Sequence, residues 1–235
     1  MVMQLEGVVP FGRSFDEYVK IFDLTARDLS KTILSVADGP ASFNAEGTKL
    51  GYRIKSIDPL YSFTAEQIRN RFYEVVDNII EQVERTPDDW LWAYHSSPRG
   101  LRENRERAIS LFCDDYENGK EQGRYAIGEL PGLKYRDCEY ELGLCSHFLF
   151  LYSDHFDEAF HLDSILEMLR VCQEVRIFPL LTLMLQPSPH LRTIVEYLEK
   201  TGYTCEIRRV SYELQRGGNE MLKITKIASY TATLC

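Results

Sequence analysis

The sequence lacks a long apolar run and an excess of basic residues, and each absence excludes a class of protein. The longest apolar stretch, around residues 175–185, is interrupted by Arg176, Pro179 and Thr182. It falls short of the roughly 18 consecutive apolar residues that a membrane helix needs. Lys and Arg number 27 against 36 Asp and Glu, which gives a formal charge of −9. Because proteins that follow a phosphate backbone carry basic patches, we expect neither a membrane nor a nucleic acid among the partners.

Metal-binding and disulfide motifs are missing as well. The six cysteines include no C-x-x-C pair and the five histidines show no recognised ligand spacing, so no metal site is predicted. Reduced thiols are expected, as is typical of a cytoplasmic protein. The first residues include Gln4, Glu6, Pro10 and Arg13, and no signal peptide is visible. These features predict a cytoplasmic location.

The residues that are present alternate between strand and helix patterns. Of the 235 residues, 44% are hydrophobic and 27% are charged, which is an ordinary globular composition. An apolar run at 33–37 stops at an Asp-Gly-Pro turn, a helix is predicted over 42–50, and a second strand is predicted over 53–57, closed by Asp58 and Pro59. This order is typical of a strand-helix-strand unit with parallel strands.

Helical patterns precede this unit and interrupt the chain after it. Residues 14–31 have apolar side chains near helical spacing, so residues 1–32 are predicted to form a helical cap. An amphipathic stripe predicts a helix over 64–85, and a second helix is predicted over about 101–118. Residues 62–124 are therefore interpreted as a helical insertion that acts as a lid, because long insertions on a scaffold often serve binding.

Strand patterns resume after the insertion. A helix is predicted to open at Ser153 or Asp154 and another to cover 190–201, while a Gly-rich loop at 215–219 predicts an antiparallel closing pair. Later strands are predicted near 125–129, 174–181, 204–212 and 221–227, and the apolar run at 140–152 is predicted to begin as a central strand. The expected fold is α/β: a doubly wound, mostly parallel seven-stranded sheet of the Rossmann-like kind, with a terminal antiparallel strand, in a single domain over residues 1–235.

Ligands of such sheets bind beyond the carboxyl ends of the strands, which directs attention to two residues. Gly39 would let the backbone approach a ligand closely, although a single glycine also marks an ordinary turn. Asp58 lies 19 residues after Gly39, a spacing that places a carboxylate under a ribose. A solvated loop aspartate is the alternative.

From about residue 30 to 227 the chain resembles the class I S-adenosylmethionine-dependent methyltransferases. The stretch 35–43 (SVADGPASF) looks like the Gly-rich first turn of this family, and 56–60 (SIDPL) looks like the acidic end of its second strand. Residues 128–131 (GELP) and 140–147 (YELGLCSH) resemble its third- and fourth-strand motifs. The resemblance implies S-adenosyl-L-methionine as the cofactor, bound across these strand ends, and a small-molecule acceptor that it does not name.

The resemblance also implies roles for individual residues. Asp58 would accept the ribose hydroxyls, Glu129 would accept the adenine amino group, and Leu60 or Leu130 would pack on the adenine ring. Each of these is also an ordinary residue for the end of a strand. The full predicted cofactor set is Asp38, Gly39, Ala41, Asp58, Pro59, Leu60, Glu129, Leu130, Ser146 and His147.

The chain departs from the family at its first turn. Ser35 stands where the family usually has an acidic residue, and Ala37 and Ala41 stand in place of two glycines. Asp38 would replace the missing acid. Close approach of a cofactor is expected if both alanines keep φ below zero.

His147 is the predicted catalytic residue, since a neutral imidazole can take a proton near pH 7; a structural, hydrogen-bonded histidine is the alternative. Predicted acceptor-binding residues are Arg13, Tyr18, Arg216 and Asn219, with a surface arginine and a plain hairpin loop as the competing interpretations. The favoured function is methyl transfer to a small molecule. The alternatives are a non-catalytic nucleoside-binding or interaction module and a nicotinamide-dependent oxidoreductase, for which the G-x-G-x-x-G motif is missing.

Overall fold

The computed structural model describes residues 8–227 and contains one seven-stranded sheet. The strand order is β3-β2-β1-β4-β5-β7-β6, and β7 runs antiparallel to both of its neighbours while the other paired strands are parallel. The predicted fold class is confirmed. The strands are β1 (Thr32–Val36), β2 (Arg53–Ile57), β3 (Tyr125–Ala126), β4 (Tyr140–Ser146), β5 (Cys172–Phe178), β6 (Tyr203–Arg209) and β7 (Glu220–Lys226).

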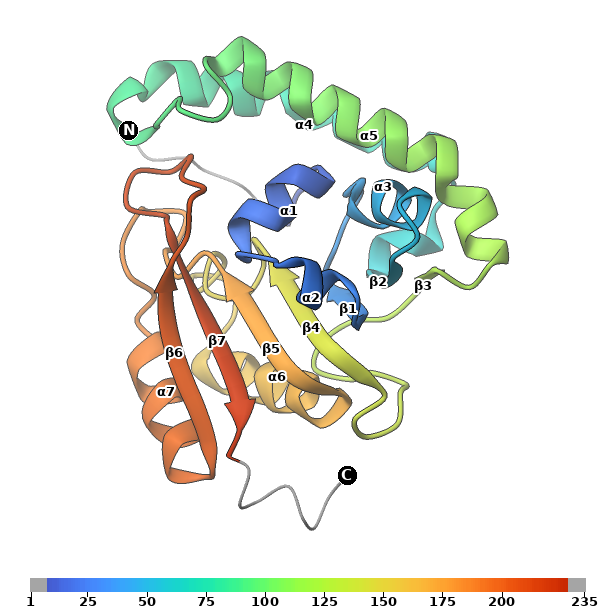
Figure 1. Ribbon diagram of the computed structural model, residues 1–235. Coiled ribbons are helices and arrows are strands. Elements are labelled where there is room, and N and C mark those ends of the chain that lie inside the picture. The colour runs from blue at the N-terminus through green and yellow to red at the C-terminus, as the bar shows by residue number, and fades with distance from the viewer. Residues whose placement is uncertain (1–7, 228–235) are drawn as a thin grey trace.

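Helices cover both faces of the sheet (Figure 1). Those on one face are α1 (Phe15–Ile21), α2 (Ala26–Leu29) and α3 (Phe43–Lys49), and those on the other are α6 (Glu158–Val171) and α7 (Leu191–Lys200). The long helices α4 (Ala65–Arg85) and α5 (Pro98–Glu121) pack on each other above α1 and α3, and β4 and β5 point their carboxyl ends toward them. Short 3-10 turns lie at Pro59–Ser62 and Pro87–Asp89. No helix within residues 8–227 is long and apolar enough to span a membrane.

The structure defines several boundaries more closely than the sequence did. In the apolar run 140–152, which was predicted to begin as a strand, β4 ends at Ser146 and the next residue, His147, has a positive φ. Helix α6 begins only after its N-cap Asp157 instead of at Ser153 or Asp154. The third strand is also shorter than predicted. An apolar run cannot show where the backbone turns, since buried loops and strands have similar composition.

Two apolar cores lie on the two faces of the sheet. The first joins β1 and β4 to α1, α3, α4 and α5 through side chains such as Tyr18, Phe43 and Phe112. The second joins the opposite face to α6 and α7 through side chains such as Ile165 and Leu198. The alternation of inward and outward side chains along each strand explains this division. Both faces are covered, as a mostly parallel sheet requires.

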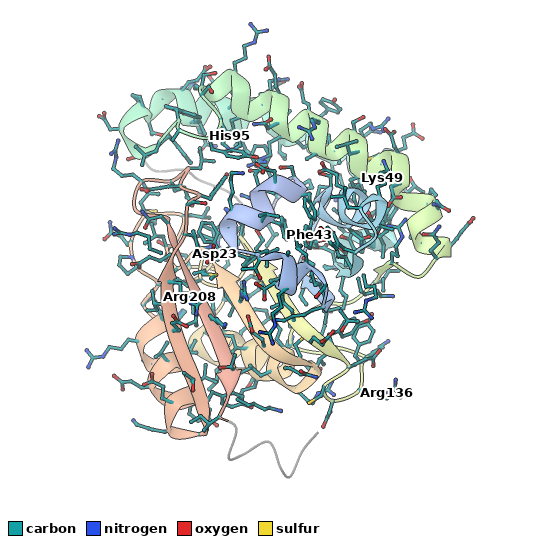
Figure 2. The ribbon with its side chains drawn as sticks, in the orientation of Figure 1. Asp23, Phe43, Lys49, His95, Arg136 and Arg208 are labelled. Carbon is teal, nitrogen blue, oxygen red and sulfur yellow. The ribbon has the colours of Figure 1, made fainter. Side chains whose placement is uncertain are left out.

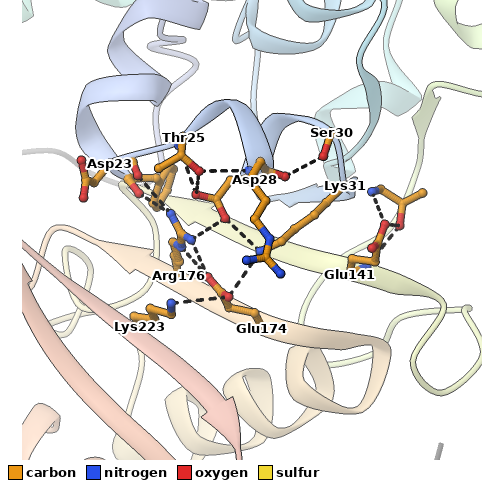
Figure 3. A network of polar contacts seen from close by, with 12 residues as sticks. Asp23, Thr25, Asp28, Ser30, Lys31, Glu141, Glu174, Arg176 and Lys223 are labelled. Atoms are coloured by element: carbon orange, nitrogen blue, oxygen red, sulfur yellow. Dashed lines mark hydrogen bonds and ion pairs between the residues drawn. The ribbon is translucent and has the colours of Figure 1, made fainter.

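A polar network fastens the N-terminal helices to the middle of the sheet (Figure 3). Arg176 on β5 donates to Asp28 of α2 at 2.9 Å, to Glu174 at 2.6 Å and to the carbonyl oxygen of Phe22 at 2.7 Å. The free-energy cost of removing these charged groups from water is compensated by the two ion pairs and the hydrogen bonds. The network therefore fixes the position of the chain segment that leads into β1.

A second buried ion pair joins α1 to α5. The carboxylate of Glu17 accepts two hydrogen bonds of 2.7 Å from Arg105, and both side chains are 0% exposed. Tyr212 donates to the same carboxylate at 3.0 Å, and His95 Nε2 lies 3.4 Å from it. Figure 2 places His95 beneath the α4–α5 layer. One carboxylate thus holds four distant segments together.

The prediction of reduced thiols is confirmed in part. Cys113, Cys145, Cys172 and Cys205 are free. Cys138 is disulfide-bonded, so the prediction is wrong at that position. Cys235 lies outside the described residues.

We expect Arg105→Met to lower the free energy of unfolding by about 3–5 kcal/mol, because it leaves Glu17 buried without its cation. Urea denaturation of both proteins measures the loss. Arg99→Met is the matched control, since Arg99 is 85% exposed and pairs only with its helix neighbour Glu103; its effect should stay within about 0.5 kcal/mol. A loss below about 1 kcal/mol in Arg105→Met would show that the pair does not hold the fold.

Candidate functional site

The register of the central strands brings three chain segments to one edge of the sheet. Val36 of β1 pairs with Ile57 of β2 on one side and with Cys145 of β4 on the other. The residues that follow these strands line a crevice with about 380 Å³ of space between atoms, partly open to solvent. It contains seven predicted site residues, namely Arg13, Tyr18, Asp38, Gly39, Asp58, Ser146 and His147.

Asp38 is a buried carboxyl group surrounded by hydroxyl donors. Ser35 and Ser56 each donate to it at 2.5 Å, and the Tyr18 hydroxyl donates to the same carboxyl oxygen as Ser35. Burial raises the pKa of Asp38 although these three hydrogen bonds oppose the rise. The carboxyl group therefore stabilises the first turn from inside, and interior hydroxyls take up the oxygens that were expected to hold a cofactor amino group.

Two residues of the first turn have left-handed backbone geometry. Ala37 has a φ of +53° and Gly39 has the same value. The condition that both alanines keep φ below zero is therefore not met at Ala37, whereas Ala41 is not among the described residues with positive φ. A non-glycine residue in this region is strained by roughly 1–2 kcal/mol, and such strain clusters at functional sites.

Asp58 holds the Gly39 peptide in place. Its carboxylate accepts the N–H of Gly39 at 2.8 Å and the N–H of Leu60 at 2.7 Å, and the Tyr61 hydroxyl donates to the Gly39 carbonyl oxygen at 2.8 Å. A carboxylate has about four acceptor positions, so Asp58 keeps capacity for a ligand. Burial raises the pKa of Asp58 to about 6. The group is consequently ionised at neutral pH and protonated in mild acid.

His147 forms the wall at the end of β4. Its φ is +54°, its N–H donates to the Phe178 carbonyl oxygen at 2.6 Å, and its Nδ1 lies 2.8 Å from the Ser146 hydroxyl. Burial, followed by the positive charges of Arg13 and Arg105, lowers the pKa of His147 well below its usual value. The imidazole is neutral at pH 7. The adjacent Cys145 is no nucleophile, because burial raises the pKa of its thiol to about 12.

A second, mostly apolar pocket lies beside the crevice and shares Val9, Phe11, Arg13 and His147 with it. It has about 700 Å³ of space between atoms, partly open to solvent. Its remaining lining residues come from α4, α5, the loops after β4 and β5 and the segment after β6: Ile79, Val83, Trp90, Leu101, Leu151, Tyr152, Phe178, Leu183, Tyr212, Leu214, Gln215 and Gly218.

The other predicted residues lie elsewhere. Pro59 and Glu129 line a separate hollow beside β3 with about 1140 Å³ of space between atoms, where Glu129 is exposed. Ala41 and Leu130 are buried in the two cores, and Leu60 packs against the first core.

The predicted residues of the loop between β6 and β7 are bound to neighbouring loop segments. Arg216 Nε donates to the Asp88 carbonyl oxygen at 2.6 Å, and Asn219 donates to Glu213 at 2.7 Å. Gln215 and Gly218 of the same loop line the apolar pocket instead.

The sequence did not point to several residues that surround the site. Tyr212 lay within a predicted strand, and its hydroxyl reaches Glu17 at 3.0 Å only because the loop after β6 returns to α1. Ser56 was assigned to a strand without a role, yet it supports Asp38. The available signal was weak, because a hydroxyl inside an apolar strand indicates an interior partner without naming it. Among the described residues no cluster of three or more His, Cys, Asp or Glu could hold a metal ion.

Comparison with solved structures finds distant likenesses over most of the chain. A magnesium protoporphyrin IX methyltransferase from Synechocystis PCC 6803 with bound SAM is 11% identical, with 90% of this chain and 77% of that chain covered and a TM-score of 0.48. The PH0226 protein of Pyrococcus horikoshii OT3 is 12% identical, with 90% and 91% covered and a TM-score of 0.45. Likenesses at this level concern the course of the chain and not its chemistry.

Sequence comparison is more specific. No family profile matches the chain. The uncharacterized protein MJ0045 of Methanocaldococcus jannaschii is 33% identical over 225 residues, which cover 95% of this chain and 99% of that protein. The chain therefore belongs to the same family as this archaeal protein.

Proposed function

We propose that the protein is an S-adenosylmethionine-dependent methyltransferase that acts on a small molecule. The observation that carries the proposal is the pair of hollows that share His147, Arg13 and Phe11 as a common wall. One hollow lies over the carboxyl ends of β1, β2 and β4, and the other is an apolar pocket under the long helices. Transfer of a group between two ligands requires such adjoining sites, because the reacting atoms must approach within about 3–3.5 Å.

The residues of the crevice fit a nucleoside donor. Asp58 is ionised at neutral pH and retains acceptor capacity for ribose hydroxyls. An added Cβ at Gly39 would meet no atom within 4 Å, so the backbone there leaves open space toward the crevice. When bound, S-adenosylmethionine supplies an electrophilic methyl group on a positively charged sulfur.

The chain's own residues would then orient the acceptor and exclude water. A neutral His147 at the shared wall can accept a hydrogen bond from an acceptor O–H or N–H, and it is a weak base because its pKa is low. Alignment of the acceptor atom with the methyl group and exclusion of water from the site provide most of the catalysis that methyl transfer needs. We assign the predicted lid, residues 62–124, to this second task, since Ile79, Val83 and Leu101 line the pocket. The predicted cytoplasmic location belongs to the same proposal.

We expect S-adenosylhomocysteine and S-adenosylmethionine to bind and to raise the melting temperature, whereas NADH should do neither. At a ligand concentration of 100 times Kd, binding to the native state adds about 2.7 kcal/mol of stability. Calorimetric titration and thermal melting check this. Binding of NADH alone would favour the oxidoreductase, and a folded protein that binds none of the three would favour a non-catalytic module.

We expect Gly39→Val to abolish binding of S-adenosylhomocysteine while the protein still folds, because the side chain would enter the crevice. Gly51→Val is the matched control. Gly51 also has a positive φ and open space around its Cβ, but it precedes β2 at the opposite edge of the sheet. Both variants should lose similar stability through backbone strain. Circular dichroism tests folding and titration tests binding. Equal binding by the two variants would remove the first turn from the site.

We expect the affinity for S-adenosylhomocysteine to fall as the pH drops through about 6. The pKa of Asp58 lies above its ordinary value, so protonation below pH 6 removes the acceptor of the ribose hydroxyls. If only the ionised form binds, affinity falls up to about tenfold per pH unit below the pKa. Titrations at pH 5, 6, 7 and 8 measure the profile. Asp58→Asn should bind more weakly at pH 8 and show no such dependence, and an unchanged profile in this variant would exclude Asp58.

A further inference from the structure

Arg13 is partly buried, and its pairing differs from that of three other arginines that are buried or partly buried. Arg105, Arg124 and Arg176 each form an ion pair with a buried or partly buried carboxylate at 2.6–2.9 Å. Arg13 forms no ion pair with any residue that the structure describes. One of its terminal nitrogens donates to the Phe11 carbonyl oxygen at 2.8 Å, and its buried Nε has no acceptor.

A guanidinium group without an ion-pair partner is unfavourable in free energy unless a ligand supplies an anion. Burial of an unpaired charge is unfavourable by several kcal/mol in real proteins. Burial and the neighbouring charge of Arg105 lower the pKa of Arg13 to about 10, so the guanidinium still carries its charge at pH 7. A cation that stays charged in an enclosed site, with a donor to spare, is complementary to an anion.

The position of Arg13 indicates which ligand would bring that anion. Arg13 carries the only formal charge among the lining residues described for the apolar pocket. In the crevice, by contrast, the carboxyl groups of Asp38 and Asp58 lie among the lining residues. The pocket is therefore the hollow in which no lining carboxylate opposes the charge of Arg13.

We propose, on the basis of the methyltransferase function above, that the methyl acceptor is a small apolar carboxylic acid whose carboxylate binds Arg13. Its apolar body lies against Trp90, Phe178 and Leu183, and its reacting atom lies near His147. The fork of the guanidinium suits a carboxylate, because two parallel N–H donors match its two oxygens.

Matched pairs of probes test the proposal on the full chain. The probes are 2-naphthoate against 2-naphthamide and octanoate against octanamide, each titrated by calorimetry. Within each pair the shape is nearly constant and the charge differs. We expect at least one acid to bind the natural protein about tenfold or more tightly than its amide. This preference should vanish in Arg13→Gln and be partly retained in Arg13→Lys. Arg99→Gln, which removes an exposed charge, is the control and should leave the preference unchanged.

Folding and donor binding are measured in the same variants. Arg13→Gln should melt at no lower temperature than the natural protein, since no carboxylate loses a partner. Its affinity for S-adenosylhomocysteine is titrated as well, because Arg13 also lines the crevice. A loss of donor affinity with an intact acid preference would overturn the proposal and place Arg13 at the donor.

The proposal also fails if no acid is preferred over its amide, or if the preference persists in both Arg13 variants. An acid preference that depends on Arg13, in a protein that binds no S-adenosylhomocysteine, would separate the two proposals. It would overturn the methyltransferase function and leave the carboxylate site standing.

Discussion

The buried carboxylate of Glu17 is the contact on which the arrangement of the site depends. It joins α1 to α5 through Arg105, and through Tyr212 and His95 it reaches the segment after β6 and the loop between α4 and α5. These segments supply much of the lining of the apolar pocket. Other polar contacts also orient this layer, from Tyr94 to Asp16 of α1 and from Arg107 of α5 to Glu46 of α3. The Glu17–Arg105 pair differs from them because both side chains are 0% exposed, so water does not compete for it.

Three buried or partly buried carboxyl groups support the site, and each is stabilised differently. Glu17 is paired with a cation, and its pKa is held well below the usual value despite burial. Asp38 is held by three hydroxyl groups and Asp58 by two backbone amides, and burial raises the pKa of both. A guanidinium favours the ionised form more strongly than neutral donors do. Glu17 is therefore fixed as an anion, while Asp58 is the carboxyl group that becomes protonated in mild acid.

Local patterns in the sequence were sufficient for the elements and for part of the site. The strand predicted over 53–57 matches β2 residue for residue, and the amphipathic stripe at 64–85 matches α4, because both signals depend on neighbouring residues. Parallel register then places Gly39 and Asp58 together, and they are joined by a hydrogen bond. The partner of Glu17 could not be predicted in this way, because Arg105 is 88 residues away. The positive φ of His147 could not be predicted either, since it arises from the loop that follows β4 and not from a turn-forming residue.

The charge balance of the shared wall determines what kind of ligand it can accept. Glu17 neutralises one of the two guanidinium groups, and the low pKa of His147 prevents a third positive charge at neutral pH. Arg13 therefore leaves one positive charge without a partner beside an apolar pocket. In the proposed function, a positively charged donor in the crevice would face the ionised carboxylate of Asp58 on one side and the guanidinium of Arg13 at the shared wall on the other. An anionic acceptor would offset the charge of Arg13 and so lower the repulsion between Arg13 and the donor. Charge alone would then favour occupancy of both hollows together.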